Sequence, residues 1–193
     1  RQRRGRTHTR CRKVKPRGIW LLLGAVTLLA MAVGYHLAQT GRTAKIPSTS
    51  ITSASNLMNV ALVDTQGQAQ RLSQWRGRIL VVNYWATWCS PCREEMPGFS
   101  RLQDKFRDKG VQFVGISIDD AAKVIEFQNE TPVSYPLLIG DMATMTDSAK
   151  LGNSRQALPF TVVFDRDGNL AASKLGRWKE EDLEPTLAEL VSR

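Results

Sequence analysis

Histidine and cysteine are both scarce in this sequence. The 193 residues include only two histidines, His8 and His36, and three cysteines, Cys11, Cys89 and Cys92. A structural zinc site needs four such ligands, and the closely spaced Cys89 and Cys92 supply two. Because the other candidates lie far toward the N-terminus, the sequence argues against a metal site in the main domain.

Acidic residues are absent from the first 17 positions, which carry nine Lys and Arg. The rest of the chain has 18 basic and 18 acidic residues, so the net charge of +9 belongs to this segment. A domain that binds nucleic acid normally has a positive excess of its own. Nucleic acid is therefore not an expected partner, and residues 1–17 are interpreted as a basic cytoplasmic tail.

Charged residues of both signs are missing from residues 18–40. A helix of roughly 20 apolar residues spans the hydrocarbon core of a membrane, so this segment predicts a transmembrane anchor. The basic tail before it predicts a cytoplasmic N-terminus. The alternative is a cleaved signal peptide with a small-residue cleavage site at Ala30-Met31-Ala32. Either interpretation places the rest of the chain outside the cytoplasm.

Hydrophobic periodicity is absent from residues 41–56, which are rich in Ser, Thr and Ala. This composition is typical of a flexible linker. The remaining residues, 57–193, are enough for one domain with a single core. The predicted organisation is therefore a tail, an anchor, a linker and one exported domain.

Short apolar runs alternate with amphipathic stretches in this domain. A strand pair is predicted around a turn at Asp64–Gly67, and the apolar run 79–86 is typical of a buried strand. A helix is predicted after the cysteines, ending at Lys109-Gly110, because apolar side chains recur at helical spacing at Met96, Phe99, Leu102 and Phe106. The other predicted elements are a strand at 111–118, a helix at 121–130, a short strand at 135–140, a helix at 144–152, a hairpin at 160–176 around Asp165–Asn169, and a helix at 180–191 with Pro185 in its first turn or at a kink. This alternation predicts an α/β fold in which helices flank a mixed central sheet.

Cys89 and Cys92 lie where the buried strand gives way to the helix. A purely structural disulfide there would close a loop of about four residues and stabilise the fold by only ~2 kcal/mol. At a helix N-terminus, free backbone N–H groups and the helix dipole favour a thiolate and lower a thiol pKa from ~8.5 toward ~7 or below. Pro91 fits the first helical turn. Cys89 is therefore predicted to be a redox nucleophile, and Cys92, one turn deeper, its resolving thiol.

These residues resemble the thioredoxin superfamily, and within it the membrane-anchored TlpA/ResA group of thiol:disulfide oxidoreductases. The resemblance covers residues 57–193 and rests on four features together, which are NYWATW at 83–88, WCSPC at 88–92, Pro97 inside the helix, and ALPFTVVFDRDG at 157–168. It implies a thioredoxin-like fold with a helix and a strand inserted between about Asp120 and Leu158. It also implies that the Cys89–Cys92 disulfide acts without a further cofactor.

The resemblance extends to individual site residues. Glu95 matches the active-site glutamate, which implies that it takes a proton from Cys92. Pro159 matches a cis-proline that faces the cysteines, although Phe160 stands where a small hydroxyl residue is expected. The residues implied to contact the substrate are Trp88, Ser90, Pro91, Leu158 and Pro159.

Four functions are compatible with the sequence. The leading hypothesis is a reductase, anchored in a bacterial cytoplasmic membrane with its domain on the periplasmic side, that reduces the oxidised cysteines of exported client proteins, for example in cytochrome c maturation or metal-site assembly. The resemblance implies a membrane electron donor of the DsbD or CcdA type. The alternatives are a disulfide-forming oxidase, a thiol peroxidase of peroxiredoxin-like fold with Thr87 near Cys89, and a non-catalytic binding module.

Overall fold

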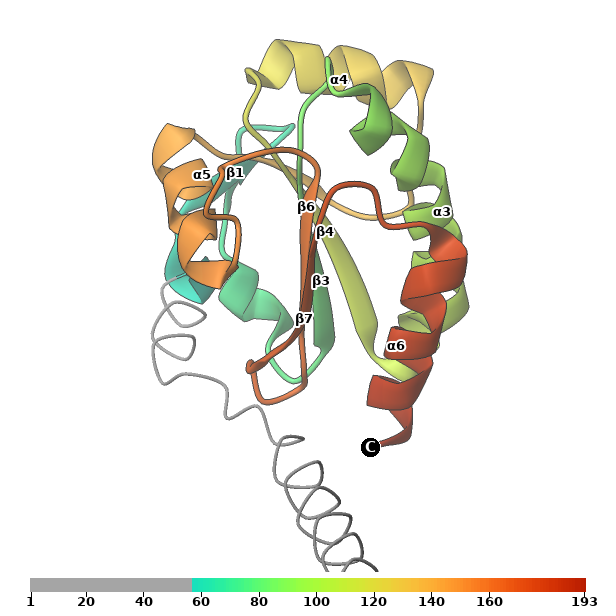
Figure 1. The fold of residues 1–193 in the computed structure, drawn as a ribbon. Coiled ribbons are helices and arrows are strands. Elements are labelled where there is room, and N and C mark those ends of the chain that lie inside the picture. The colour runs from blue at the N-terminus through green and yellow to red at the C-terminus, as the bar shows by residue number, and fades with distance from the viewer. Residues whose placement is uncertain (1–56) are drawn as a thin grey trace, which may run out of the picture. The chain divides into compact units, whose positions relative to one another are not determined.

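A computed structural model describes residues 57–193, in which a seven-stranded mixed sheet is covered by helices on both faces (Figure 1). The strands are β1 (Leu62–Asp64), β2 (Ala69–Gln70), β3 (Ile79–Trp85), β4 (Val111–Ser117), β5 (Leu137–Ile139), β6 (Phe160–Phe164) and β7 (Leu170–Leu175). The α-helices are α3 (Ser90–Phe106), α4 (Ala121–Glu130), α5 (Met142–Ser148) and α6 (Glu180–Ser192). Three short 3₁₀ helices are η1 (Leu72–Trp75), η2 (Arg107–Lys109) and η3 (Ala149–Leu151).

The strands lie in the order β2-β1-β5-β4-β3-β6-β7. β3, β4 and β5 run parallel, while β6 pairs antiparallel with β3, and β7 with β6. At the other edge, β1 pairs antiparallel with both β5 and β2. This pairing confirms the predicted mixed sheet, and it places β3, which leads to the cysteines, between two long partners.

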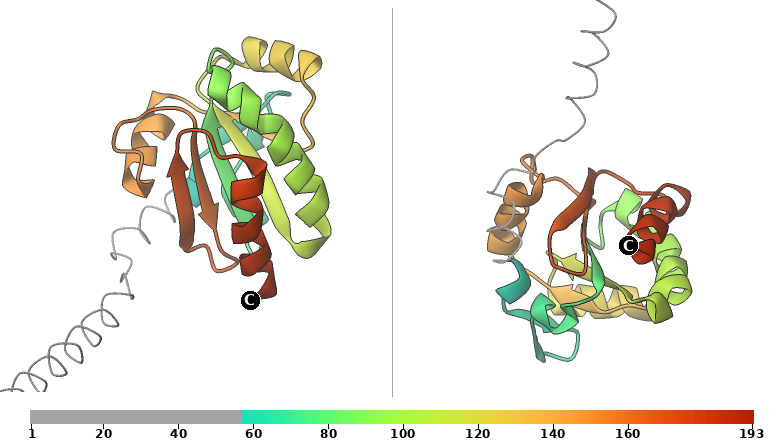
Figure 2. Two further views of the ribbon diagram at one scale, coloured as in Figure 1. Left: turned by 45° about the vertical axis from the view of Figure 1, so that its right-hand side comes forward. Right: turned by 90° about the horizontal axis from the view of Figure 1, so that it is seen from below.

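All seven residues of β3 are buried because helices cover both faces of the sheet. Val81 and Trp85 point to the face covered by α3, α4 and α6, whereas Val82 and Tyr84 point to the opposite face. Figure 2 shows α5 on that opposite side, away from α3 and α6. The cysteines belong to the first of these two cores.

Most predicted elements are present, with differences at their ends. α3 ends at Phe106, three residues before the predicted end, and the chain continues as η2 to Gly110, which adopts a left-handed φ of 83°. α5 begins at Met142, two residues before the predicted start, because Asp141 caps it by accepting a 2.8 Å hydrogen bond from the N–H of Thr144. Pro185 lies inside α6, past its first turn. The segment between Asp120 and Leu158 holds α4, β5 and also α5, one helix more than the resemblance implies.

No helix within residues 57–193 is long and apolar enough to cross a membrane. The predicted tail, anchor and linker, at 1–17, 18–40 and 41–56, lie outside the residues that the structure describes. The anchor and the domain boundaries therefore stay predictions.

Candidate active site

The end of β3 and the start of α3 position the two cysteines. Cys89 is the N-cap of α3, with extended backbone angles, and Pro91 lies in the first turn. Cys89 and Cys92 form a disulfide, with their Cα atoms 5.3 Å apart. The helix-start position predicted for Cys89 is confirmed, so this residue lies at the positive end of the α3 dipole.

The two sulfurs differ in their access to solvent. Cys92 is completely buried, whereas Cys89 keeps 6% of its surface exposed. Around Cys89 the side chains of Trp88, Ser90 and Pro91 are exposed, Trp88 to 68%. Cys89 is therefore the cysteine nearer the surface, with exposed neighbours on both sides.

The loop before Cys89 is anchored to the end of β4. The Asp119 carboxylate accepts hydrogen bonds from the N–H of Thr87 at 2.6 Å and from its hydroxyl at 3.0 Å, both at Oδ2. The N–H of Asp119 in turn donates to Ser117 Oγ at 3.1 Å. Because β3 and β4 are parallel, the residues after both strands meet at one edge of the sheet. Sequence analysis missed Asp119, although an acid directly after a buried strand was the available signal.

Pro159 reaches the same edge from β6. The Leu158–Pro159 peptide bond is cis, as the resemblance implies. Phe160, the first residue of β6, pairs with Tyr84 of β3, so Pro159 lies beside the end of that strand. Leu158 is half-buried, whereas Phe160 is buried in the opposite core, where its ring centroid lies 5.9 Å from that of Tyr84. The aromatic ring of Phe160 therefore fills that core and does not shape the surface next to the cysteines.

Glu95 lies one helical turn after Cys92 and is 3% exposed. Its Oε1 accepts a hydrogen bond from Asn83 Nδ2 at 2.8 Å, and its Oε2 accepts one from the N–H of Trp178 at 2.7 Å. Burial raises the pKa of Glu95 to about 7, even though these two bonds and the nearby charges of Arg177 and Lys174 lower it. The carboxyl can therefore gain or lose a proton near neutral pH.

Asn83 and Trp178 are site residues that sequence analysis missed. Asn83 Nδ2 also donates to Thr161 Oγ1 at 3.0 Å, which links β3, α3 and β6. The sequence did carry a signal for Asn83, because it is the one polar residue in the apolar run of β3. Trp178 carried no such signal, since its contribution is a backbone N–H brought from 83 residues away.

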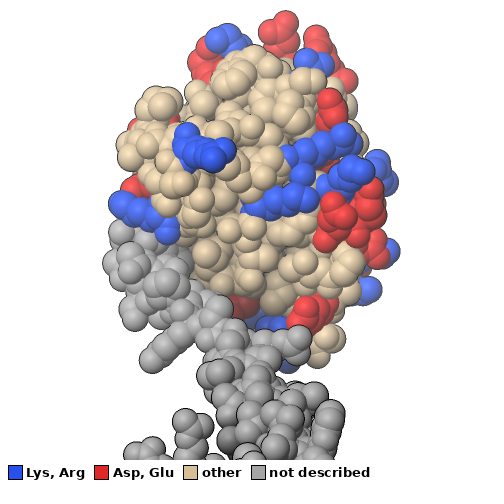
Figure 3. All heavy atoms as spheres, viewed as in Figure 1, with Lys and Arg blue, Asp and Glu red and all other residues tan. Residues whose placement is uncertain are grey.

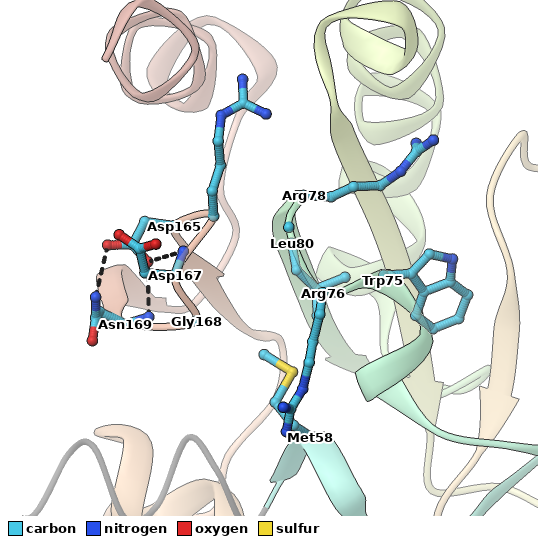
Figure 4. Close-up of a pocket in the computed structure, with 11 residues that line it drawn as sticks. Met58, Trp75, Arg76, Arg78, Leu80, Asp165, Asp167, Gly168 and Asn169 are labelled. Atoms are coloured by element: carbon cyan, nitrogen blue, oxygen red, sulfur yellow. Dashed lines mark hydrogen bonds between the residues drawn. The ribbon is translucent and has the colours of Figure 1, made fainter.

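A hollow of about 310 Å³ lies at the opposite end of β3 from the cysteines (Figure 4). It is lined by Arg76 and Arg78 before the strand and by the β6–β7 turn. In that turn Asp165 accepts three hydrogen bonds, from the N–H groups of Asp167 and Asn169 and from the Asn169 side chain. These bonds occupy the carboxylate, and the thiols are remote, so this hollow is not the reaction site.

The described part of the chain contains no candidate metal site. Among residues 57–193, no group of three or more His, Cys, Asp or Glu side chains is placed to hold an ion. The chemistry available at this site is thus that of a thiol pair with a titratable carboxyl beneath it.

Comparison with known proteins agrees with this geometry. Residues 42–190 match the Redoxin family. The chain belongs to the Redoxin family. It is 27% identical, over 158 residues, to the thiol-disulfide oxidoreductase ResA of Geobacillus kaustophilus, covering 81% of this chain and 87% of that protein.

Solved structures of other proteins share this fold. A thioredoxin-related protein from Neisseria meningitidis serogroup B is 34% identical, with a TM-score of 0.60 over 68% of this chain and 99% of that one. A thiol:disulfide interchange protein from Chlorobium tepidum, 22% identical, has a TM-score of 0.62 over 68% of this chain and 92% of that one, and supports the fold alone. The predicted thioredoxin-like fold and resemblance to ResA and TlpA are confirmed, and the enzyme class is thiol:disulfide oxidoreductase.

Proposed function

We propose that this protein reduces disulfides in exported proteins through the Cys89/Cys92 dithiol. The observation that carries the proposal is the pairing of an accessible thiol at a helix start with a completely buried one, above a buried carboxyl that titrates near pH 7. The accessible position suits attack on a client, and the buried position suits an internal resolving thiol.

The proposed reaction begins with both cysteines reduced. The Cys89 thiolate attacks one sulfur of the client disulfide, which forms a mixed disulfide and releases the other client sulfur as a thiolate. Cys92 then gives its proton to Glu95 and attacks the Cys89 sulfur. The Cys89–Cys92 bond forms, the bond from Cys89 to the client breaks, and the second client sulfur leaves. Two electrons have passed from the protein to the client.

Residues around Cys89 are proposed to hold the client. The exposed side chains of Trp88, Ser90 and Pro91 surround Cys89 in the sequence, and the half-buried Leu158 and buried Pro159 precede β6 at the same edge of the sheet. An extended client segment is proposed to contact both groups. No additional cofactor is needed, because the thiols carry the electrons themselves.

The alternatives have less support. A disulfide-forming oxidase needs extra donors to stabilise the Cys89 thiolate, and Ser90 and Pro91 offer only one hydroxyl between the cysteines. A peroxidase would need the Thr87 hydroxyl at the reacting sulfur, but this hydroxyl donates to Asp119. A non-catalytic module does not account for a carboxyl held under the resolving thiol.

Mixing the reduced protein with an oxidised client protein, without oxygen, tests the function. One client disulfide is expected to be reduced for each Cys89–Cys92 disulfide formed, as counted by thiol alkylation and mass spectrometry. If the client stays oxidised while the dithiol persists, or if client thiols are oxidised instead, the protein is not a reductase.

The location is proposed from the charge asymmetry of the chain. Nine basic residues precede the apolar segment 18–40 and none of the first 17 residues is acidic, which favours an anchor in a bacterial cytoplasmic membrane with the domain outside. Electrons would then have to come from a membrane donor of the DsbD or CcdA type, and the clients would be exported proteins such as apocytochromes or metal-site proteins.

A reporter active only outside the cytoplasm is expected to work when fused after Arg193. Activity of a cytoplasmic reporter alone would contradict this.

A further inference from the structure

A charged cleft of about 230 Å³ opens between the start of α3 and the segment that leads into α6. The buried residue Glu95 lines it, together with the more exposed side chains of Glu94, Arg101, Arg177 and Glu180. Figure 3 shows Lys, Arg, Asp and Glu gathered over the side of the domain where α3 and α6 lie. This hollow, the Glu95 cleft, brings solvent and charge close to the carboxyl beneath Cys92.

The Glu95 cleft is lined by none of the proposed client contacts, which are Trp88, Ser90, Pro91, Leu158 and Pro159. The residues around Glu95 are therefore distinct from the proposed client contacts, and Ser90 is connected to the cleft through its hydrogen bond to Glu94.

An ion pair joins the two sides of the cleft next to Glu95. Arg177 Nη1 lies 2.6 Å from Glu94 Oε2, and Ser90 Oγ donates to the other Glu94 oxygen at 3.3 Å. Glu94 directly precedes Glu95, and Arg177 directly precedes Trp178, whose N–H donates to the buried carboxylate. The pair thus places one charge of each sign beside Glu95 and its backbone donor.

We propose that Arg177 and Glu94 are positioning residues that set the proton affinity of Glu95 in opposite directions. The expected effect on turnover rests on the proposed function. The proton affinity of Glu95 does not, because it is a property of the folded domain. The Arg177 cation favours the ionised carboxyl, and the Glu94 carboxylate works against this effect by neutralising part of the Arg177 charge.

Other charged groups surround Glu95 and must be accounted for. Lys174 of β7 lowers the pKa of Glu95 less than Arg177 does, and it also pairs with Asp182 at 3.5 Å. The buried phenol of Tyr135 also interacts electrostatically with Glu95. The remaining charged groups that line the cleft are Arg101, Glu180, Lys179 and Glu181. Arg101 and Glu180 pair with each other at 2.6 Å, so their charges largely cancel at Glu95.

Direct titration of the Glu95 carboxyl by carbon NMR, in the oxidised protein without client, tests the proposal. Arg177→Gln is expected to raise the pKa of Glu95 and Glu94→Gln to lower it, each changing the ionisation constant about three-fold, as for other partly exposed charges. Arg177→Lys, which keeps the cation, is expected to restore most of the wild-type value. Below pH 7, the release of client should become about three-fold slower in Arg177→Gln and three-fold faster in Glu94→Gln.

Lys105→Gln is the matched control, since it breaks an ion pair of 2.6 Å between α3 and α6, with Glu184, that does not line the cleft, and it is expected to leave the Glu95 titration unchanged. Shifts in the same direction for Arg177→Gln and Glu94→Gln, or no shift in either, would overturn the proposal and reduce the pair to a structural link. Opposite shifts of the titration without any change in turnover would support the proposal and contradict the proton transfer from Cys92 to Glu95.

Discussion

Cys92→Ser is expected to capture client proteins as stable mixed disulfides on Cys89 and to lower multiple-turnover reduction on the order of 1,000-fold or more. The reason is that the two cysteines occupy different positions. Cys89 caps α3 and has an exposed edge, so it can still attack a client disulfide. Serine at the buried position 92 cannot complete the second exchange, and the client stays attached.

Cys89→Ser is the control for this experiment. It removes the accessible thiol and leaves Cys92, which has no exposed surface, so it is expected to capture no client. Capture can be scored as a shift in mass that reducing agent reverses. If capture instead depends on Cys92, the assignment of nucleophile and resolving thiol is reversed.

Glu95→Gln is expected to slow the release of client from the mixed disulfide by roughly 10-fold or more, the usual range for a positioned acid or base. Glu95 accepts a proton only when it is ionised. Because burial raises its pKa to about 7, the ionised fraction and the release rate should rise from pH 5 to about 8 and then level off. Glutamine has nearly the same shape but cannot accept the proton, so this rise should disappear.

The measurement is the release rate from a preformed mixed disulfide across that pH range. Glu126→Gln, which alters an exposed carboxylate on α4, provides a control that should retain the wild-type profile. The reduction potential should move little, because a proton acceptor speeds the exchange in both directions. A Glu95→Gln profile that matches wild type at every pH would show that Cys92 loses its proton elsewhere.

Local sequence patterns predicted the elements that position the thiols. The run 79–86 was predicted to be a buried strand because it is apolar except for Asn83, and helical spacing with a terminal glycine identified α3. These signals depend on residues close together in the chain. The start of α5 was misplaced because the side chain of Asp141 provides the cap, and that bond was not visible in the hydrophobic pattern.

Local sequence patterns could not predict the residues that surround Glu95. Its two hydrogen bonds come from Asn83, 12 residues earlier, and from the backbone of Trp178, 83 residues later. The turn from β3 into α3 and the packing of α6 against α3 bring these groups together. The cysteines and Glu95 could thus be predicted from the sequence, whereas the partners that set the proton affinity of the carboxyl could not.

The reduction potential of the Cys89/Cys92 couple, measured by equilibration with a glutathione or dithiothreitol series at pH 7, tests the central claim most directly. A couple that passes electrons to clients must hold them less tightly than the clients do. A reductase is therefore expected to have a potential near about −250 mV or lower, in the range of reducing thioredoxins. A value near about −120 mV would mean that the disulfide is a strong oxidant, and would contradict the assignment of this protein as a reductase.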